Sequence, residues 1–180
     1  MKKLYLITSL ITMLLAGGCG EDSPDCFQAS GDLEQVTLEV PEFSGITVFE
    51  NIQLVLRYGA RQEVVLETGK NLRADVSARV VDGILELRDT NSCNYFRSYG
   101  RTVFYVTTPD LELLRSSTGW PIRSEGVLPF NSLSLFSESF NNPEAATTDG
   151  SFDLELRVDR LRVVSNGIAY FKLKGHATEL

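Results

Sequence analysis

The sequence predicts an all-β protein, and three observations lead to that prediction. From Val36 onward, apolar residues alternate with polar or charged ones, which is the period-two pattern of strands with one buried face. Turn-forming pairs such as Asp82-Gly83 and Asn166-Gly167 separate the alternating runs. No window of a dozen residues has an apolar stripe at helical spacing with caps at its ends. The length of 180 residues and the 43% hydrophobic content are those of one globular domain.

The expected strands follow one another along the whole domain. Each is a run in which every second residue is apolar, so that one face of the strand can be buried. The runs are 36–40, 52–56, 64–66, 76–80, 85–87, 104–106, 133–135, 152–156, 161–163 and 169–173.

The second half of the chain carries a loose repeat. The pattern L-x-L/V, then an apolar or small residue and then Ser, starts at Leu111, Leu133 and Leu161, at offsets of 22 and 28 residues. The longer offset contains a polar insertion at 141–148, as expected for an extra loop on one coil. Such a repeat suggests a solenoid of stacked coils, a β-helix. A β-sandwich of hairpins also places strands every 8 to 12 residues, so periodicity alone leaves both architectures open.

Residues 1–18 are predicted to be a lipoprotein signal peptide. Lys2 and Lys3 form a positive n-region, and 4–15 is an apolar segment too short to span a bilayer as a helix. The next residues, Leu15-Ala16-Gly17-Gly18-Cys19, resemble the lipobox of bacterial lipoproteins. That resemblance implies that Cys19 is the mature N-terminus and carries the lipid. An ordinary secretory peptide with a leftover cysteine is the alternative.

Residues 19–25 are expected to form a lipidated acidic tether, so one expected partner is the membrane, reached through the lipid anchor at Cys19. Gly20 follows the cysteine, and by resemblance to lipoprotein sorting rules a residue other than Asp here favours the outer membrane. The acidic run Glu21-Asp22-Ser23-Pro24-Asp25 also resembles a surface-export signal of some Gram-negative groups. Whether the domain faces the periplasm or the outside stays open.

Cys26 and Cys93 are expected to form a disulfide, because they are the remaining two cysteines in an oxidising compartment. The wide separation would make the bond worth about 4 kcal/mol in the chain-entropy view. A metal site is the competing interpretation. One histidine and no C-x-x-C leave too few ligands at workable spacing, so no metal is expected.

Six segments together resemble one known family. They are Cys26 to Gly31, Phe43 to Val48, Asn51 to Leu56, Gly69 to Leu72, Asp82 to Leu87 and Cys93 to Tyr99. In order and spacing they are similar to the head GIN domain family, the autotransporter adhesins of Bacteroidetes envelopes. The resemblance implies a right-handed parallel β-helix over 26–180, an anchored lipoprotein and an adhesin-like role. Family members usually have a Gly-Ser-Gly turn where this chain has Ser117-Thr118-Gly119-Trp120.

Catalytic motifs are nearly absent. His176 is the only histidine and no nucleophile elbow is present, so a Ser-His-Asp triad has no support. Paired acids, Asp149 with Asp153 or Glu112 with Glu138, could act as the general acid and base of a glycosidase or lyase, since β-helices carry such enzymes. Acids on the outer faces of strands are more often simply solvated. We expect no enzyme and no cofactor.

A binding surface is predicted from aromatic and arginine residues. Tyr95, Phe96, Arg97 and Tyr99 surround Cys93, and Trp120 stands in a turn. Such side chains anchor protein interfaces and stack on sugars, which favours a polysaccharide or protein ligand. Alternatively they cap the solenoid or cover the disulfide. Nucleic acid is disfavoured, because 24 acidic residues outnumber 17 basic ones.

The expected function is a non-enzymatic cell-envelope lipoprotein that acts as an adhesin-like or ligand-binding module. The alternatives are a carbohydrate-active enzyme on a β-helix scaffold and a passive envelope-structure protein. At the C-terminus, the strand pattern of 167–173 runs to Leu180 with no capping helix after it. We therefore expect a truncated solenoid, or one whose last coil is covered by self-association.

Overall fold

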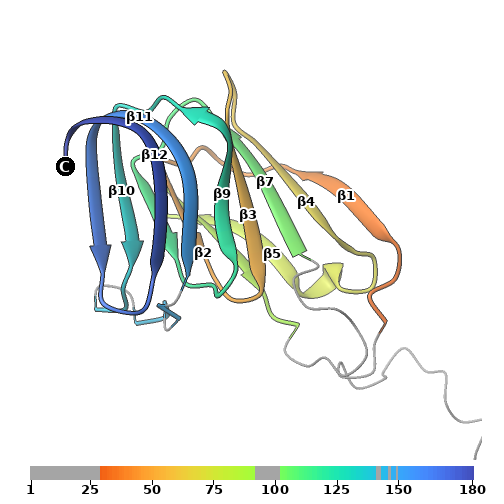
Figure 1. The fold of residues 1–180 in the computed structure, drawn as a ribbon. Coiled ribbons are helices and arrows are strands. Elements are labelled where there is room, and N and C mark those ends of the chain that lie inside the picture. Colours follow the sequence, from red (N-terminus) through yellow and green to blue (C-terminus); the bar gives the residue numbers. More distant parts are fainter. Residues whose placement is uncertain (1–28, 92–101, 141–142, 146, 149) are drawn as a thin grey trace, which may run out of the picture.

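The computed structural model describes residues 29–91, 102–140, 143–145, 147–148 and 150–180 (Figure 1). In this part of the chain the secondary structure is twelve strands and one short 3-10 turn, η2 (Arg73–Asp75), so the all-β prediction is confirmed. The strands are β1 (Leu33–Leu38), β2 (Gly45–Val48), β3 (Ile52–Tyr58), β4 (Glu63–Gly69), β5 (Val76–Val81), β6 (Ile84–Asp89), β7 (Thr102–Thr108), β8 (Leu113–Ser116), β9 (Pro121–Leu128), β10 (Ser132–Ser137), β11 (Ser151–Ser165) and β12 (Tyr170–Glu179).

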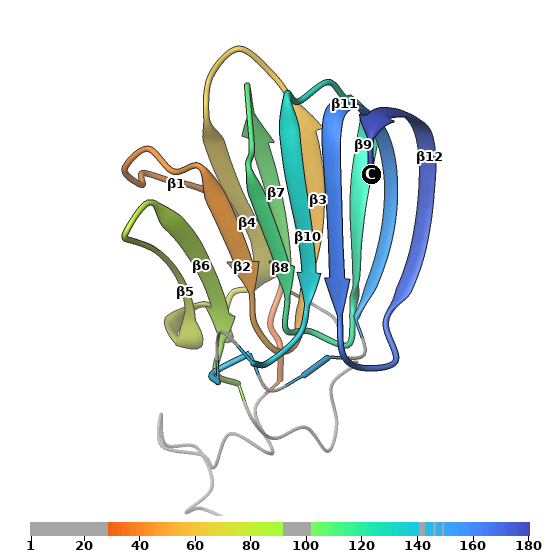
Figure 2. The ribbon, with the colours of Figure 1, turned by 90° about the vertical axis from the view of Figure 1, so that its left-hand side faces the viewer.

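Most strands lie in two stacks of parallel neighbours (Figures 1 and 2). The first stack has the order β6, β2, β8, β10 and then residues 160–165 of β11. The second stack has the order β7, β3, β9, the earlier part of β11 and β12. Because β11 takes part in both stacks, all twelve strands belong to one continuous sheet that wraps around a single core.

Each circuit of the chain adds one strand to each stack. The pairs β6/β7, β2/β3, β8/β9 and β10/β11 form successive layers, which we call rungs, and residues 160–165 with β12 form the last rung. Antiparallel strands flank the first rung, with β5 beside β6, β4 beside β7, and β1 beside β4. Parallel neighbours need a crossover connection, and here the opposite stack provides it.

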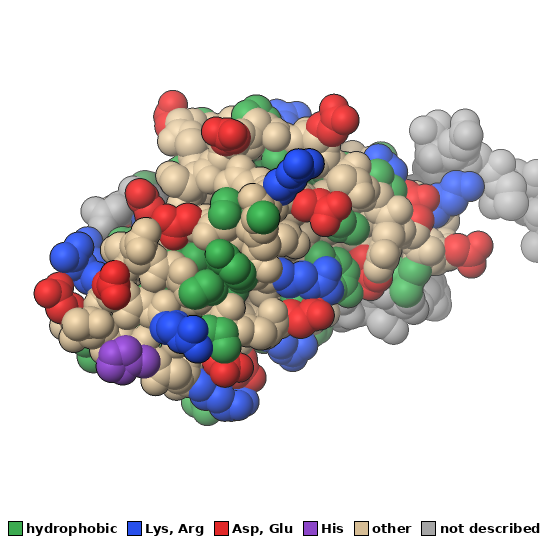
Figure 3. Space-filling view, turned by 90° about the horizontal axis from the view of Figure 1, so that it is seen from above, with side chains coloured by type: hydrophobic (Ala, Val, Ile, Leu, Met, Phe, Trp, Pro, Cys, Tyr) green, Lys and Arg blue, Asp and Glu red, His purple; other side chains and the backbone are tan. Residues whose placement is uncertain are grey.

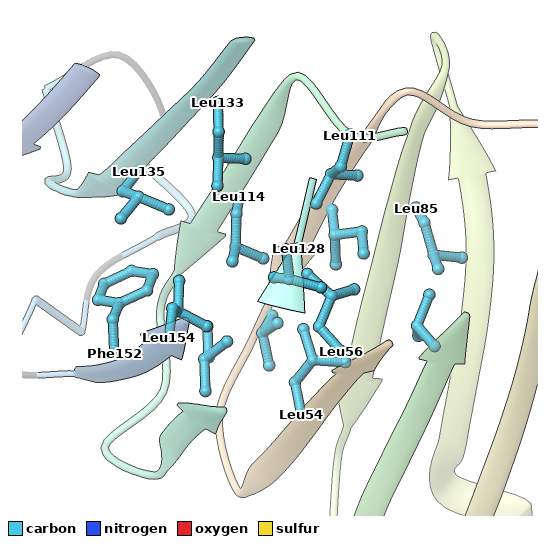
Figure 4. Packing of buried hydrophobic residues seen from close by; sticks show 14 of the residues in the cluster. Leu54, Leu56, Leu85, Leu111, Leu114, Leu128, Leu133, Leu135, Phe152 and Leu154 are labelled. Atoms are coloured by element: carbon cyan, nitrogen blue, oxygen red, sulfur yellow. The ribbon is translucent and has the colours of Figure 1, made fainter. Parts of the chain in front are cut away.

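The core consists of side chains from one rung stacked on those from the next (Figure 4). In each stack, the strand pairing aligns one fully buried apolar residue of every rung with one of the next rung. The lines are Phe104, Leu54, Ile122 and Phe152 in the second stack and Leu85, Ile46, Leu114 and Leu135 in the first. The apolar residues of the alternating runs therefore point into the core in both stacks.

The Asp82-Gly83 pair forms the turn that its sequence predicts. Both residues have positive φ, 51° and 78°, and they join Val81 to its paired residue Ile84 in the β5–β6 hairpin. Positive φ at both central positions is what a two-residue type I′ turn requires.

Two details of the predicted strands are wrong. The runs 152–156 and 161–163 belong to one strand, β11, which passes from one stack to the other. The repeat offset of 28 residues agrees with the pairing of Leu133 with Leu161, but the offset of 22 is one residue too long, because Leu135 faces Leu114. Leu111 is buried just before β8 and so mimics the start of the strand.

Candidate functional site

The turns that lead from the first stack to the second gather at one end of the fold, the lower end in Figure 1, which we call the lower edge. They comprise the described residues of 49–51, 117–120, 138–150 and 166–169. Tyr95, Phe96, Arg97 and Tyr99 lie outside the described residues. They belong to the connection between the end of β6 and the start of β7, which also links the first stack to the second. Among the described residues, four turns thus belong to this edge.

Large apolar side chains are exposed at the lower edge. Phe140 is 81% exposed and Ile168 is 90% exposed. Trp120, singled out from the sequence, is partly buried, and its backbone N–H donates to the Thr118 hydroxyl at 3.2 Å. The Thr118 hydroxyl, itself buried, donates to the Ile52 carbonyl at 3.0 Å, so the Trp120 turn is fixed to the next rung.

A buried ion pair supports the turn that carries Phe140. Arg115 Nη1 lies 2.5 Å from Glu138 Oε1, and the Glu138 side chain is 1% exposed. The other carboxylate oxygen, Oε2, accepts the Phe140 N–H at 2.7 Å. The Arg115 guanidinium also lies over the Phe136 ring, 4.8 Å from its centre. A carboxylate that is paired on both oxygens holds the start of the 138–150 turn in one conformation.

A second contact fixes the far part of the same turn. Arg88 on β6 pairs with Glu144 at 2.5 Å, and its guanidinium lies 3.4 Å from the centre of the Phe49 ring. Ser137 Oγ donates to the Thr148 carbonyl at 3.2 Å. The polar insertion, which the sequence predicts only as an extra loop, is therefore tied to two rungs, those of β6 and β10. No signal in the sequence pointed to the Arg88–Glu144 contact, because the two residues lie far apart in the chain.

The two ends of the 92–101 connection are also held by a buried network. Asp89 accepts the Thr102 hydroxyl at 2.5 Å and the Asn91 backbone and side-chain N–H groups at 2.9 and 2.7 Å. Thr68 and Thr102 share a further hydrogen bond of 3.1 Å. The sequence reasoning missed this network, which joins the described residues on the two sides of 92–101.

Two of the four carboxylates considered as acid and base pairs, Glu138 and Asp153, have other partners. Glu138 is paired with Arg115, whereas Glu112 is exposed. Asp149 lies outside the described residues. The hydrogen bond from Lys172 holds the pKa of Asp153 below its ordinary value, so that this group is a poor proton donor. His176 is exposed on β12, opposite Arg157.

Cys19, Cys26 and Cys93 lie outside the described residues. Within the ranges that the structure covers, no group of three or more His, Cys, Asp or Glu side chains could hold a metal ion. None of the helical segments described is long and apolar enough to cross a membrane.

The fold and the edge define an all-β domain that presents anchored turns with exposed aromatic and aliphatic side chains. The chain belongs to the family described as "Putative auto-transporter adhesin, head GIN domain", whose profile matches residues 42–180, and the resemblance noted in the sequence is thereby confirmed. No curated protein matches the chain.

Two solved structures show the same fold. One is a putative adhesin from Bacteroides fragilis, with a TM-score of 0.68 and 21% identity, covering 81% of this chain and 64% of that one. The other is a putative adhesin from Parabacteroides merdae, with a TM-score of 0.58 and 14% identity, covering 81% of this chain and 58% of that one. This chain therefore spans less than two thirds of either protein.

Proposed function

We propose that this chain is a non-enzymatic, adhesin-like protein of the cell envelope that binds a polysaccharide or protein ligand through the lower edge. One observation carries the proposal: Phe140 is exposed on a turn whose start is fixed by the buried Arg115–Glu138 pair. An exposed aromatic side chain on a rigid support loses little conformational entropy on binding, which is how binding surfaces gain affinity.

The proposed surface extends the sequence prediction. It joins Trp120 and the segment with Tyr95, Phe96, Arg97 and Tyr99 to Phe140, which the sequence reasoning did not select. The Asp89 and Thr118 hydrogen bonds support the idea that these turns form one surface.

For the architecture, we propose the right-handed parallel β-helix that the family resemblance implies. The rung order and the parallel registers from β6 to β12 support it. A sandwich of hairpins would pair its strands antiparallel, whereas antiparallel pairs in the described part involve only β1, β4 and β5 with their neighbours.

We also propose the Cys26–Cys93 disulfide. Residues that flank both cysteines bind the same turn: Asn71 donates to the Ala29 carbonyl at 2.9 Å, and Asn91 donates to the Leu72 carbonyl at 3.0 Å. Cys26 is three positions before Ala29 and Cys93 is two positions after Asn91, which is within reach of a bond. Mass spectrometry of the non-reduced protein should find the linked peptides, and two free thiols would disprove the pair.

The lipid anchor at Cys19 and the outer-membrane location are proposals that rest on the signal sequence. Replacing Cys19 with Ser should move the protein from the detergent phase to the aqueous phase on phase partitioning. Persistence in detergent would reject lipidation. Protease treatment of intact cells, with a periplasmic protein as control, tells surface display from a periplasmic orientation.

Binding and catalysis can be separated in one experiment. The purified protein is incubated with immobilised polysaccharides and envelope proteins, and both retention and release of reducing ends are measured. We expect retention without release, and loss of retention in Phe140→Ser and Trp120→Ser. The matched control is Tyr58→Ser, an aromatic residue 54% exposed at the end of β3, where the chain passes to the opposite edge. Release would indicate a carbohydrate-active enzyme. Neither retention nor release would favour a passive envelope protein and contradict the proposal.

A further inference from the structure

Two shallow hollows lie side by side on the outer face of the second stack, over β9, β11 and β12 (Figure 1). The first has a volume of about 140 Å³, and Arg123 and Lys174 contribute to its lining. The second has a volume of about 210 Å³ and is lined in part by Arg157 and His176. Glu155 lines both hollows, so they form one continuous depression, which we call the groove.

A bulge in β9 opens the first hollow. The pairing between the two strands passes from Arg123 with Asp153 to Val127 with Glu155, so β9 advances four residues where β11 advances two. The Glu155 backbone N–H donates to the Ser124 hydroxyl at 2.8 Å, which ties the bulge to β11. Bulges are common beside binding sites because they redirect side chains, and this one belongs to a sheet that holds it in place.

The groove carries an excess of positive charge. Asp153 is already paired with Lys172, at 2.8 Å. Glu155 is the other carboxylate in the lining, and it has no ion pair in the described part of the chain. Three exposed cations of the groove likewise have no ion-pair partner among the described residues: Arg123, Arg157 and Lys174. In a chain with a net charge of -7, such a local excess favours an anionic ligand.

The spacing of the two arginines fits a polymer. Arg123 pairs in register with Asp153, and Arg157 is four residues further along β11. At about 3.3 Å per residue, the two positions are about 13 Å apart along the strands. A single small anion cannot contact both, whereas a chain with repeated negative charges can. Both arginines lie on strands that have a paired neighbour on each side, so the groove does not depend on the outer edge of β12.

The groove leads to the lower edge, and its chemistry suits a sugar. Trp120 directly precedes β9, and Arg123 is the third residue of that strand. At the same end of the stack, Tyr170 begins β12 and is 66% exposed. An exposed aromatic ring offers a stacking surface for a sugar ring, and the Glu155 carboxylate can accept hydrogen bonds from hydroxyl groups.

We infer that the groove binds an acidic polysaccharide, with its carboxylate or sulfate groups on Arg123 and Arg157 and its hydroxyl groups on Glu155. The inference rests on the proposed binding function and names the class of its ligand. A planar guanidinium group holds an oxyanion through two parallel hydrogen bonds. Sugar rings that continue beyond the first hollow reach Trp120 at the lower edge.

The test measures binding of the purified full chain to four soluble polymers: polygalacturonate, dextran sulfate, dextran and polyglutamate. Polygalacturonate carries carboxylates and dextran sulfate carries sulfates, so the pair tells which anionic group the groove prefers. We expect at least one of them to bind at least tenfold more tightly than neutral dextran and than polyglutamate, and to bind more weakly as the salt concentration rises. Equal binding to dextran, equal or tighter binding to polyglutamate, or binding of neither acidic polysaccharide would overturn the inference.

The double variant Arg123→Gln, Arg157→Gln should weaken binding of the preferred acidic polysaccharide at least tenfold. Both side chains are exposed and without an ion pair among the described residues, so thermal unfolding should be unchanged and the loss is not a folding defect. Arg79→Gln is the matched control, because Arg79 is exposed on β5 and has no ion pair in the part of the chain described. A double variant that binds like wild type, or a control that loses as much, would overturn the inference.

Failure of the proposed lower-edge site gives a different result. In that case Phe140→Ser and Trp120→Ser bind the acidic polysaccharide like wild type, whereas the double arginine variant still loses it. If the inference alone fails, the Phe140 and Trp120 variants lose binding and the arginine variant keeps it.

Discussion

Removing one partner of the buried Arg115–Glu138 pair should destabilise the domain strongly. In Glu138→Ala, the Arg115 guanidinium stays about nine-tenths buried with no carboxylate beside it. Breaking a buried pair in this way costs about 3–5 kcal/mol, because the remaining charge is desolvated without compensation. A domain of this size shifts its Tm by about 2–4 °C per kcal/mol, so we expect a drop of roughly 6–20 °C.

Thermal and urea unfolding followed by circular dichroism measure this effect. The double variant Arg115→Met with Glu138→Leu removes both charges and should recover most of the loss, since apolar residues of similar volume can replace a buried pair. Glu125→Gln, at the exposed pair with Arg57, is the control and should change stability by less than about 1 kcal/mol. A Glu138→Ala variant as stable as the control, or a double variant no better than the single one, would refute the reasoning.

Two other predictions concern β12. Gly175 has a φ of 112°, and a Cβ there would overlap the Leu156 carbonyl oxygen, so Gly175→Ala should cost about 1–3 kcal/mol in urea unfolding. Gly119→Ala, where nothing lies within 4 Å, should cost little, and equal losses would contradict the geometry. Lys172→Met should raise the pKa of Asp153, because the hydrogen bond from Lys172 is the main cause that lowers it. The pair stabilises the fold at neutral pH and ceases to do so as pH falls through the lowered pKa, so the two proteins should converge in stability at acid pH; an unchanged Asp153 titration by NMR would refute this.

Much of the fold could be predicted from local pattern. Alternation marks most strands because they have one buried face, whereas β2, buried at all four positions, had no alternating run. The Asp82-Gly83 pair marks a hairpin because few other residue pairs adopt positive φ at both positions. The passage of β11 between stacks could not be predicted, since both of its halves alternate like separate strands. The one-residue error in the repeat arose because Leu111 is buried outside its strand.

The candidate site was predicted only in part. Trp120 was selected because a bulky residue stands in a turn where a small one is usual. Phe140 was missed, because nothing local distinguishes an exposed phenylalanine from a buried one. Its backbone is held by Glu138, whose partner Arg115 is 23 residues away in the sequence and meets it only in the fold.

The upper end of the molecule differs in chemistry from the turns proposed for binding. The upper end of the molecule carries acidic and basic side chains interspersed, with no large area of one sign or of apolar character (Figure 3). Such a surface is typical of a solvated face. It makes the upper end a suitable place for control substitutions.

Adherence of cells that display this chain tests the central claim most directly. Cells with the wild-type protein are compared with cells expressing the Trp120→Ser, Phe140→Ser double variant and the Tyr58→Ser control, at equal protein levels, on surfaces coated with host or bacterial polysaccharide and protein. We predict that the double variant adheres no better than cells without the protein, and that the control adheres like wild type. Equal adherence of the double variant and wild type would contradict the assignment of the lower edge as the binding surface.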